Sequence, residues 1–316
     1  MASVRDGTPR AGMITLFAIP KPMEGEFLRI QENAILSWLR LGFGAEVLLF
    51  GDERGVEHFA RRHGIDHHRE VARTEAGTPR VDDLFRRVET LATRPLIAYI
   101  NADIILGRDF PDAVRALENI RRPFLAVGRR WDLDYPGTVD FSDPAWEADL
   151  RREVDERGIL HPSSGIDYFI YRRGLWGEIP PFAVGRTMWD NWLIWRARKR
   201  GAMVVDATAS IWAVHQNHGY NHHPQGSDGV WKGPEAERNE RLAGGLGRFF
   251  TIDDATHRLA DDKVDRFRDA FHRRRWWYTL PAIWAPAAWA AALGAGLSWA
   301  ITGIRKRIAR MRGRIS

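Results

Sequence analysis

The stretch that decides the fold is Leu96-Ile97-Ala98-Tyr99-Ile100-Asn101-Ala102-Asp103. Its first five residues are apolar or aromatic, which is typical of a strand that is buried on both faces of a sheet. The run ends at Asn101 and Asp103, so it carries an amide and a carboxylate to the end of that strand. Ligands of open α/β sheets bind at the carboxyl ends of the strands. The stretch therefore predicts an α/β sheet and the edge at which a site lies.

An alternation of strands and helices surrounds this stretch. Before it, the apolar spacing predicts strands over 13–19 and 45–50 and helices over 27–41, 56–62 and 81–91. After it, the spacing predicts strands over 124–127, 166–171, 203–205 and 211–214 and a helix over 188–199. Strands and helices that alternate in this way are typical of a parallel sheet. The predicted fold class is α/β, with a doubly wound, mostly parallel sheet.

The composition is that of an ordinary folded protein, with 44% hydrophobic and 28% charged residues. The sequence has no cysteine, which excludes disulfides, thiolate metal sites and a cysteine nucleophile. Residues 1–10 lack the apolar segment of a secretory signal, so we expect the folded part to stay in the cytosol. The net charge of +6 comes mainly from the end of the chain, which indicates an anionic surface rather than a nucleic acid as partner.

The chain is predicted to divide into a domain over 1–250, a helical linker over 251–275 and a tail over 276–316. The tail carries no charge from 276 to 304, is interrupted by Pro281 and Pro286, and has arginines on both sides. Positive charge on both sides disfavours export of the end of the chain. We therefore expect a membrane-associated helical segment on the cytoplasmic face, either interfacial or re-entrant or a single span. A buried core helix is the alternative.

Further polar residues stand at the ends of predicted elements. Asp52 follows the strand over 45–50, and Asp190 opens the helix over 188–199. His215 and His218 follow the strand over 211–214, within the densest group of histidines in the chain. Carboxylates and imidazoles are metal ligands, and a carboxylate can also serve as a general base. Each acid also has a plain structural reading, because Asp103 can cap a turn, Asp52 can lie in a surface turn, and Asp190 can complement a helix dipole.

The order of strand 13–19, strand 45–50 with Asp52, and Tyr99-Ile-Asn-Ala-Asp103 resembles GT-A glycosyltransferases of the family-2-like type, over residues 13–223. In such enzymes an acidic D-x-D motif ends a strand and holds a divalent metal on the donor diphosphate. Here Asn101 replaces the first acid, which leaves Asp103 as the ligand and Asn101 as a ribose or water-mediated contact. The resemblance implies Mn²⁺ or Mg²⁺ as cofactor, with Asp103, His215 and His218 as its ligands.

The same resemblance implies roles for other positions, and it identifies residues 1–250 as the GT-A-like catalytic domain. Asp190 matches the general base of inverting enzymes. Asp167 and Trp189 correspond to a pocket for the acceptor or the donor sugar. The residues implied in donor binding are Pro20, Lys21, Asp52, Arg80, Asn101 and Asp103.

The predicted function is transfer of a sugar from a nucleotide-diphospho-sugar to a hydroxyl of a glycan or lipid-linked acceptor. A role in surface polysaccharide or glycolipid synthesis follows from the predicted anchor alone. Two alternatives stay open. One is a metal-dependent hydrolase or phosphotransferase that uses the histidines. The other is a non-catalytic, membrane-tethered nucleotide-sugar-binding protein, for which Asn101 in place of an acid is the main reason.

Overall fold

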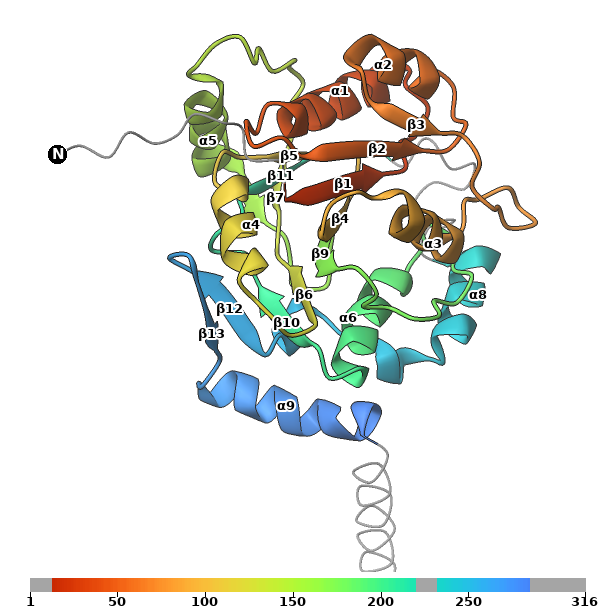
Figure 1. Ribbon diagram of the computed structural model, residues 1–316, viewed down its shortest axis with the longest axis vertical. Coiled ribbons are helices and arrows are strands. Elements are labelled where there is room, and N and C mark those ends of the chain that lie inside the picture. The colour runs from red at the N-terminus through yellow and green to blue at the C-terminus, as the bar shows by residue number, and fades with distance from the viewer. Residues whose placement is uncertain (1–12, 220–231, 285–316) are drawn as a thin grey trace, which may run out of the picture. The chain divides into compact units, whose positions relative to one another are not determined.

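A nine-stranded sheet forms the centre of the computed structural model, which describes residues 13–219 and 232–284 (Figure 1). Strands β3, β2, β1 and β4 are parallel neighbours, as are β6, β10 and β12, and β9 runs antiparallel between β4 and β6. The prediction of an α/β fold with a mostly parallel sheet is confirmed. In sheet order the strands are β13 (Lys263–Arg266), β12 (His257–Ala260), β10 (Met203–Asp206), β6 (Phe124–Val127), β9 (Tyr168–Arg172), β4 (Leu96–Ile100), β1 (Ile14–Ala18), β2 (Glu46–Phe50) and β3 (Asp66–His68).

A smaller second sheet lies where the chain leaves β4. Its strands, in order, are β5 (Ile104–Leu106), β11 (Ala213–Gln216), β7 (Trp131–Leu133) and β8 (Ile159–Leu160). In β11, His215 is paired with Ile104 on one side and with Asp132 on the other. Since Ile104 directly follows Asp103, this register places His215 beside the end of β4.

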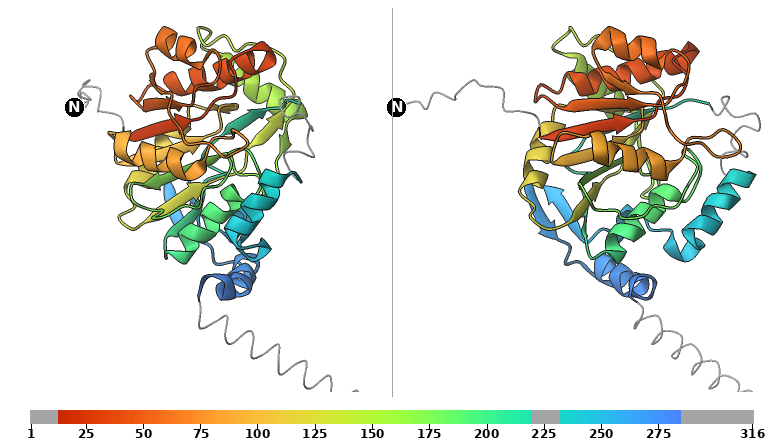
Figure 2. Two further views of the ribbon diagram at one scale, coloured as in Figure 1. Left: turned by 90° about the vertical axis from the view of Figure 1, so that its right-hand side faces the viewer. Right: turned by 45° about the vertical axis from the view of Figure 1, so that its right-hand side comes forward.

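Helices cover both faces of the central sheet (Figures 1 and 2). Helices α1 (Gly25–Leu39), α2 (Val56–His63) and α4 (Phe110–Glu118) pack on one face. Helices α3 (Val81–Leu91) and α6 (Trp189–Lys199) bring their aromatic side chains to the other face. The remaining helices are α5 (Trp146–Arg157), α8 (Pro234–Ala243), α9 (Ala270–Ile283) and two 3₁₀ turns, η1 (Leu246–Arg248) and η2 (Ile252–Asp254).

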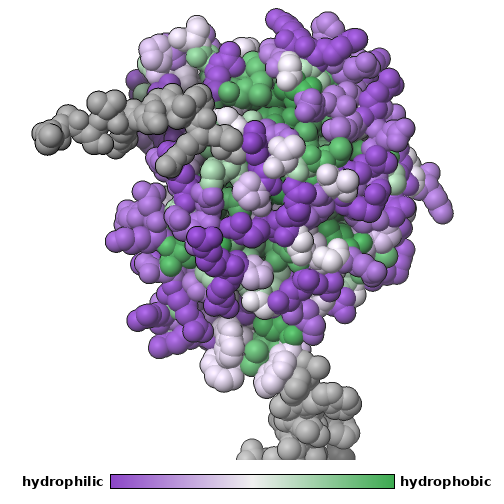
Figure 3. Space-filling view, viewed as in Figure 1, coloured by the Kyte–Doolittle hydropathy of each residue, from purple (hydrophilic) through white to green (hydrophobic). Residues whose placement is uncertain are grey.

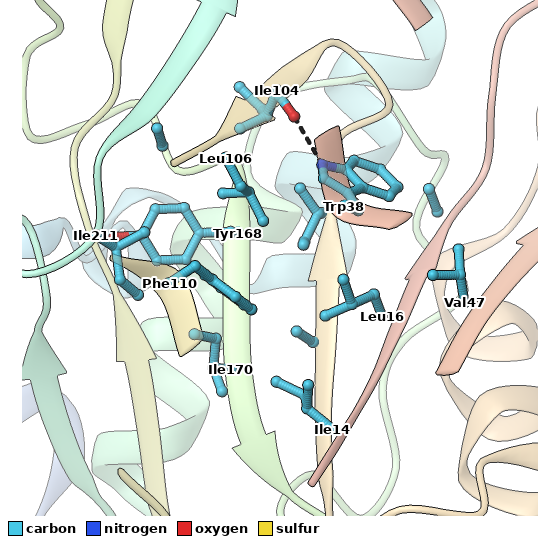
Figure 4. Packing of buried hydrophobic residues seen from close by; sticks show 14 of the residues in the cluster. Ile14, Leu16, Trp38, Val47, Ile104, Leu106, Phe110, Tyr168, Ile170 and Ile211 are labelled. Carbon is cyan, nitrogen blue, oxygen red and sulfur yellow. Dashed lines mark hydrogen bonds between the residues drawn. The ribbon is translucent and has the colours of Figure 1, made fainter. Parts of the chain in front are cut away.

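The alternation of side chains along β1 explains how the two faces are filled. Leu16 lies in the cluster that also holds Trp38 of α1, and the Trp38 indole Nε1 donates to the carbonyl of Ile104 at 2.8 Å (Figure 4). Phe17 points the other way and meets Phe85 of α3, with ring centres 5.2 Å apart. Each large apolar side chain buried here contributes about 1.5–3 kcal/mol to folding. The core thus fixes the end of β4, where Asp103 lies, from both sides.

The predicted helical linker over 251–275 is wrong in its first part. Residues 257–266 instead form the β12–β13 hairpin, and β12 adds to the central sheet beside β10. The hairpin turns at Asp261 and Asp262, whose φ angles are +49° and +58°. Positive φ at both central residues is the type I′ geometry that matches the twist of paired strands. The compact unit therefore extends to Phe267, and a second unit starts at Arg268.

The second unit holds α9, which includes Pro281 of the predicted tail. Among the residues with described coordinates, we find no helix that is both long enough and apolar enough to cross a bilayer. Most of the predicted membrane-associated tail, from 285 onward, lies outside the described residues. Membrane association therefore stays a prediction. The face of the first unit shown in Figure 3 is covered mainly by hydrophilic side chains, with smaller apolar areas between them.

Candidate active site

Three side chains predicted as metal ligands lie together at the end of β4. Asp103 follows this strand, His215 belongs to β11, and His218 lies just beyond β11. One ligand atom from each residue lies within 4.8 Å of the other two. The Asp103 Oδ2 atom is 3.1 Å from His218 Nε2 and 3.8 Å from His215 Nε2. The sequence placed both histidines after a strand, whereas His215 is part of one.

The hydrogen bonds of the two imidazoles determine which nitrogens face Asp103. His215 Nδ1 lies 3.2 Å from Asn217 Oδ1 and 3.4 Å from Asp132 Oδ1, and His218 Nδ1 lies 3.1 Å from the carbonyl oxygen of Gly219. All three neighbours are acceptors, and they favour a proton on Nδ1 of each ring. Nε2 of each ring faces the Asp103 carboxylate, and a ring with its proton on Nδ1 offers the Nε2 lone pair to a metal ion.

A cation fits the centre of this group. The Asp103 carboxylate and the two Nε2 atoms converge on one point, and with the ring protons on Nδ1 all three groups can donate a lone pair to a cation. In addition, Asp103 Oδ1 is buried and has no hydrogen-bond partner among the described residues. A buried carboxylate oxygen without a partner is costly, and a coordinated metal removes that cost. One carboxylate and two imidazoles are a suitable donor set for a divalent transition metal.

Lys21 reaches the same group from the end of β1. Its ammonium Nζ is 3.2 Å from His218 Nε2 and 4.5 Å from the centre of the Phe27 ring. Gln31 holds the backbone of Lys21 through two hydrogen bonds, and Pro20, which precedes it, is buried. Burial lowers the pKa of Lys21, and the charge of Asp103 opposes that shift.

The pKa of Asp103 lies well below its usual range. Burial alone would raise this pKa, but the hydrogen bond with His218 and the charges of His215 and Lys21 outweigh burial. The carboxylate is therefore ionised near neutral pH. An ionised carboxylate is the form that binds a metal ion.

Asn101 is held by its neighbours rather than pointing freely into the site. Its Nδ2 donates to Asp167 Oδ1 at 2.6 Å, and its Oδ1 accepts from the Tyr99 hydroxyl at 2.8 Å. The Asn101 backbone N–H also donates to the carbonyl oxygen of Asp167 at 2.9 Å. An aspartate at position 101 would place a second negative charge against Asp167. The hydrogen bonds to Asp167 and Tyr99 therefore explain why an amide, rather than a carboxylate, stands at position 101.

Asp190 lies in the first turn of α6, as predicted, and is partly exposed. Burial raises the pKa of its carboxyl to about 7, assisted by the charge of Asp167 and opposed by a hydrogen bond from the Asn191 backbone. Near neutral pH such a carboxyl can accept a proton and release it again. Met188, which caps the helix, has a φ of +85°, a strained value for a residue with a side chain. Strain of this kind is concentrated at functional sites.

Trp189 turns away from solvent, with 5% of its surface exposed. Its ring packs edge-on against Tyr99, with ring centres 5.3 Å apart, and against Phe169. It fixes α6 to the sheet behind the site, and this packing is that of a core side chain. Asp167, which is buried, lies between Asn101 and Arg130 at the start of β9.

Two residues at the site were missed from the sequence, Arg130 and Asp132. Arg130 forms ion pairs with Asp132, at 2.9 Å, and with Asp167. Asp132 also accepts from His161 Nδ1 at 2.5 Å. The signal was present, because Asp132 follows the predicted strand over 124–127 much as Asp103 follows its own strand. Asp132 lies in β7, which has only three residues, too few for periodicity to reveal a strand.

Asp52 and Arg80 are two of the residues implied in donor binding. Their ion pairs are formed with residues outside the cluster of Asp103, His215 and His218. Asp52 is exposed after the end of β2 and forms an ion pair with Arg73, which holds the pKa of the carboxyl below its usual value. Arg80 precedes α3 and pairs with Asp82 at 2.6 Å. Their roles in donor binding stay predictions.

Comparison with solved structures finds similar chains at low identity. S. aureus TarS 1–349 in complex with UDP-GlcNAc matches with a TM-score of 0.41 and 14% identity, over 65% of this chain and 59% of that chain. The same protein in complex with UDP matches with a TM-score of 0.40 and 14% identity, over 64% of this chain and 60% of that chain. A mycobacterial protein matches with a TM-score of 0.41 and 15% identity, over 66% of this chain and 68% of that chain. This chain is similar to proteins solved with UDP and UDP-GlcNAc.

These matches have a limited reach. The chain spans about 59% of the length of the first TarS structure. No family model and no curated protein matches the sequence. TM-scores near 0.4 carry no conclusion about activity, which has to come from the residues of this chain.

Proposed function

We propose that the protein is a glycosyltransferase that uses a nucleotide-diphospho-sugar donor and a divalent metal ion, Mn²⁺ in preference to Mg²⁺. The observation that carries the proposal is the convergence of Asp103 with the Nε2 atoms of His215 and His218 at the edge where α/β sheets bind ligands. Mg²⁺ strongly prefers oxygen ligands, whereas two imidazoles favour a transition metal. This donor set is our reason for preferring Mn²⁺.

The residues divide the chemistry between them. When bound, the metal ion would neutralise the negative charge that develops on the departing diphosphate. Lys21 adds a second positive charge on the same side. Asp190 takes the proton from the acceptor hydroxyl as the oxygen bonds to the anomeric carbon and the bond from that carbon to the diphosphate breaks. Attack opposite the leaving group inverts the anomeric centre, and the nucleoside diphosphate leaves.

The hydrogen bonds of Asn101 bear on the alternative of a non-catalytic binding protein. The reason for that alternative was the loss of the first acid of the motif. Asn101 lies between Asp167 and the Tyr99 hydroxyl, where an amide is favoured whatever the activity. Its presence is therefore no reason to exclude catalysis.

Thermal stability in the presence of donors tests the proposed function. We expect one UDP-, GDP- or dTDP-sugar to raise the midpoint of unfolding only when Mn²⁺ is present, because metal and diphosphate bind as a unit. An uncharged sugar serves as the control. Stabilisation by Zn²⁺ alone, with hydrolytic activity that UDP and GDP leave unchanged, would instead support a metal-dependent hydrolase.

We also propose that the end of the chain binds the cytoplasmic surface of a membrane, so that the acceptor is lipid-linked or a surface glycan. Beyond Asp269 the sequence contains no acidic residue and ends in an arginine-rich segment. In α9 and just after it, Trp277, Tyr278 and Trp284 are 67%, 76% and 56% exposed. Exposed aromatic side chains next to arginines are typical of helices that bind anionic lipid.

Truncation tests the membrane proposal. Removal of all residues after Phe271 should abolish co-flotation with vesicles that contain anionic lipid and leave the donor-dependent thermal shift unchanged. Neutral vesicles are the control for charge. Flotation of the truncated chain with anionic vesicles at the full-length level would contradict the proposal.

A further inference from the structure

Asp132 is the charged residue nearest to the proposed metal ligands that has no role so far. It lies in β7, directly beside His215 of the parallel neighbour β11. Its Oδ1 is 3.4 Å from His215 Nδ1, on the side of the ring opposite the nitrogen that faces Asp103. A carboxylate in this position recognises the N–H of a metal-binding imidazole.

The other contacts of Asp132 show why it is not itself a ligand in this arrangement. Oδ1 also accepts from Arg130 Nε at 2.9 Å, and Oδ2 accepts from His161 Nδ1 at 2.5 Å. Both oxygens are thus directed at donors of the surrounding protein. Asp103, in contrast, keeps one buried oxygen without any partner among the residues described. Asp103 therefore has an oxygen available to bind a metal ion, whereas both oxygens of Asp132 are engaged in hydrogen bonds with protein groups.

Asn217 supports the same orientation of His215. Its Nδ2 donates to Asp134 at 2.9 Å, which leaves its Oδ1 to accept from His215 Nδ1 at 3.2 Å. Two acceptors thus share one N–H. This arrangement excludes a neutral ring with its proton on Nε2, since Nδ1 would then present a lone pair to two oxygens.

We propose that Asp132 is a positioning residue that fixes the ring orientation and the tautomer of His215, so that Nε2 is available to a divalent metal ion. The inference rests on the proposed function, because it assumes that Asp103, His215 and His218 bind a metal. Partners of this kind, one shell out from the ligands, typically change metal affinity by about 10- to 100-fold when they are removed. Arg130 and His161 hold Asp132 in place.

Binding of Mn²⁺ in the absence of nucleotide tests this inference, with free Mn²⁺ followed by electron paramagnetic resonance. We expect Asp132→Ala to raise the dissociation constant about 10- to 100-fold. Asp132→Asn keeps a neutral acceptor of the same size. Its dissociation constant for Mn²⁺ should lie between those of Asp132→Ala and the wild type. Asp140→Ala, an exposed acid in the loop after β7, is the matched control and should bind as the wild type does.

The tautomer of His215 gives a second, independent measurement. Nitrogen-15 NMR of the metal-free protein should show the proton on Nδ1 in the wild type and a mixture of tautomers in Asp132→Ala. A purely structural role would leave the tautomer unchanged. If Asp132→Ala does not fold, Asp132→Asn provides both measurements.

Asp103→Ala separates the two possible failures. The first failure would be that the Asp132 variants keep the wild-type Mn²⁺ affinity and the wild-type tautomer of His215, while Asp103→Ala loses Mn²⁺ binding. This result would overturn the role of Asp132 alone. Mn²⁺ binding that persists in Asp103→Ala would overturn the metal site and with it the proposed function.

Discussion

Asp190→Asn is expected to reduce transfer by about 10²- to 10⁴-fold, the range that a general base contributes. The substitution keeps the size of the side chain but removes its ability to take a proton from the acceptor. Donor binding, measured with Mn²⁺ and the preferred nucleotide sugar, should be unchanged, because the proposed donor-binding residues include Asp103 and Lys21 but not Asp190. The loss should therefore appear in kcat.

Asp112→Asn is the matched control for this substitution. Asp112 is also an acid in the first turn of a helix, α4, but it is exposed and paired with Arg115. It should keep full activity. Activity of Asp190→Asn within a few-fold of the wild type would contradict the role of Asp190.

The pH dependence of activity follows from the same group. Since burial and Asp167 raise the pKa of Asp190 to about 7, kcat/KM should rise with pH and level off above about 7. In Asp167→Asn the like charge is gone, so the rising limb should move to lower pH. The limb should be absent from the residual activity of Asp190→Asn.

The raised pKa also has a cost in stability. A carboxyl whose pKa rises from 3.8 to about 7 on folding destabilises the folded state above about pH 7, and has no effect well below pH 3.8. The full shift corresponds to roughly 4 kcal/mol, which partial exposure reduces to about 2 kcal/mol. Asp190→Asn should therefore be more stable than the wild type by about 2 kcal/mol near pH 8. Denaturant unfolding of both proteins near pH 8 measures this difference in the free energy of unfolding. It also shows that the variant folds.

Asp103→Ala has the second large expected effect, loss of both metal binding and transfer. The carboxylate contributes the negative charge of the proposed site, and its removal leaves two imidazoles beside the ammonium of Lys21, which lies 3.2 Å from His218. Calorimetric titration with Mn²⁺ should show no binding at concentrations that saturate the wild type. Activity should fall by at least the factor expected for Asp190→Asn.

Asp149→Ala provides the comparison, because this acid on α5 is 55% exposed and paired with Arg152. It should bind Mn²⁺ and transfer sugar normally. Metal-independent transfer at the wild-type rate by Asp103→Ala would show that the cluster of Asp103, His215 and His218 is not the metal site.

The sequence contained enough information to predict the parallel half of the sheet. The strand over 96–100 was predicted to be buried on both faces, and all five residues of β4 are buried. Long helices with a regular apolar face, such as α1 and α6, were also predicted close to their observed bounds. In these elements local periodicity and tertiary packing agree.

The short strands and the last hairpin could not be read from periodicity. Strand β7 has three residues, and its place is decided by pairing with β11, about 80 residues further along the chain. The β12–β13 hairpin turns at two aspartates with positive φ, where glycine or asparagine is the usual signal. Its last strand, β13, lies at the edge of the sheet and carries the charged residues Lys263, Asp265 and Arg266, which weaken the apolar signal of a strand.

For the site, the sequence predicted three candidate ligands that the structure brings together, but not the residues that support them. Asp103, His215 and His218 stand out by residue type and by their places after strands. The contacts of Arg130 with Asp132 and Asp167 depend on how two sheets meet, which a single sequence does not reveal. Trp189 looked like a sugar-stacking residue, and its burial against Tyr99 follows from the same tertiary packing.

Anomalous X-ray scattering from crystals grown with Mn²⁺ and a nucleoside diphosphate tests the central claim most directly. We expect one strong anomalous peak within coordination distance of Asp103, His215 Nε2 and His218 Nε2, with the diphosphate on its open side. No peak at that position, or a diphosphate bound elsewhere on the protein, would contradict the account.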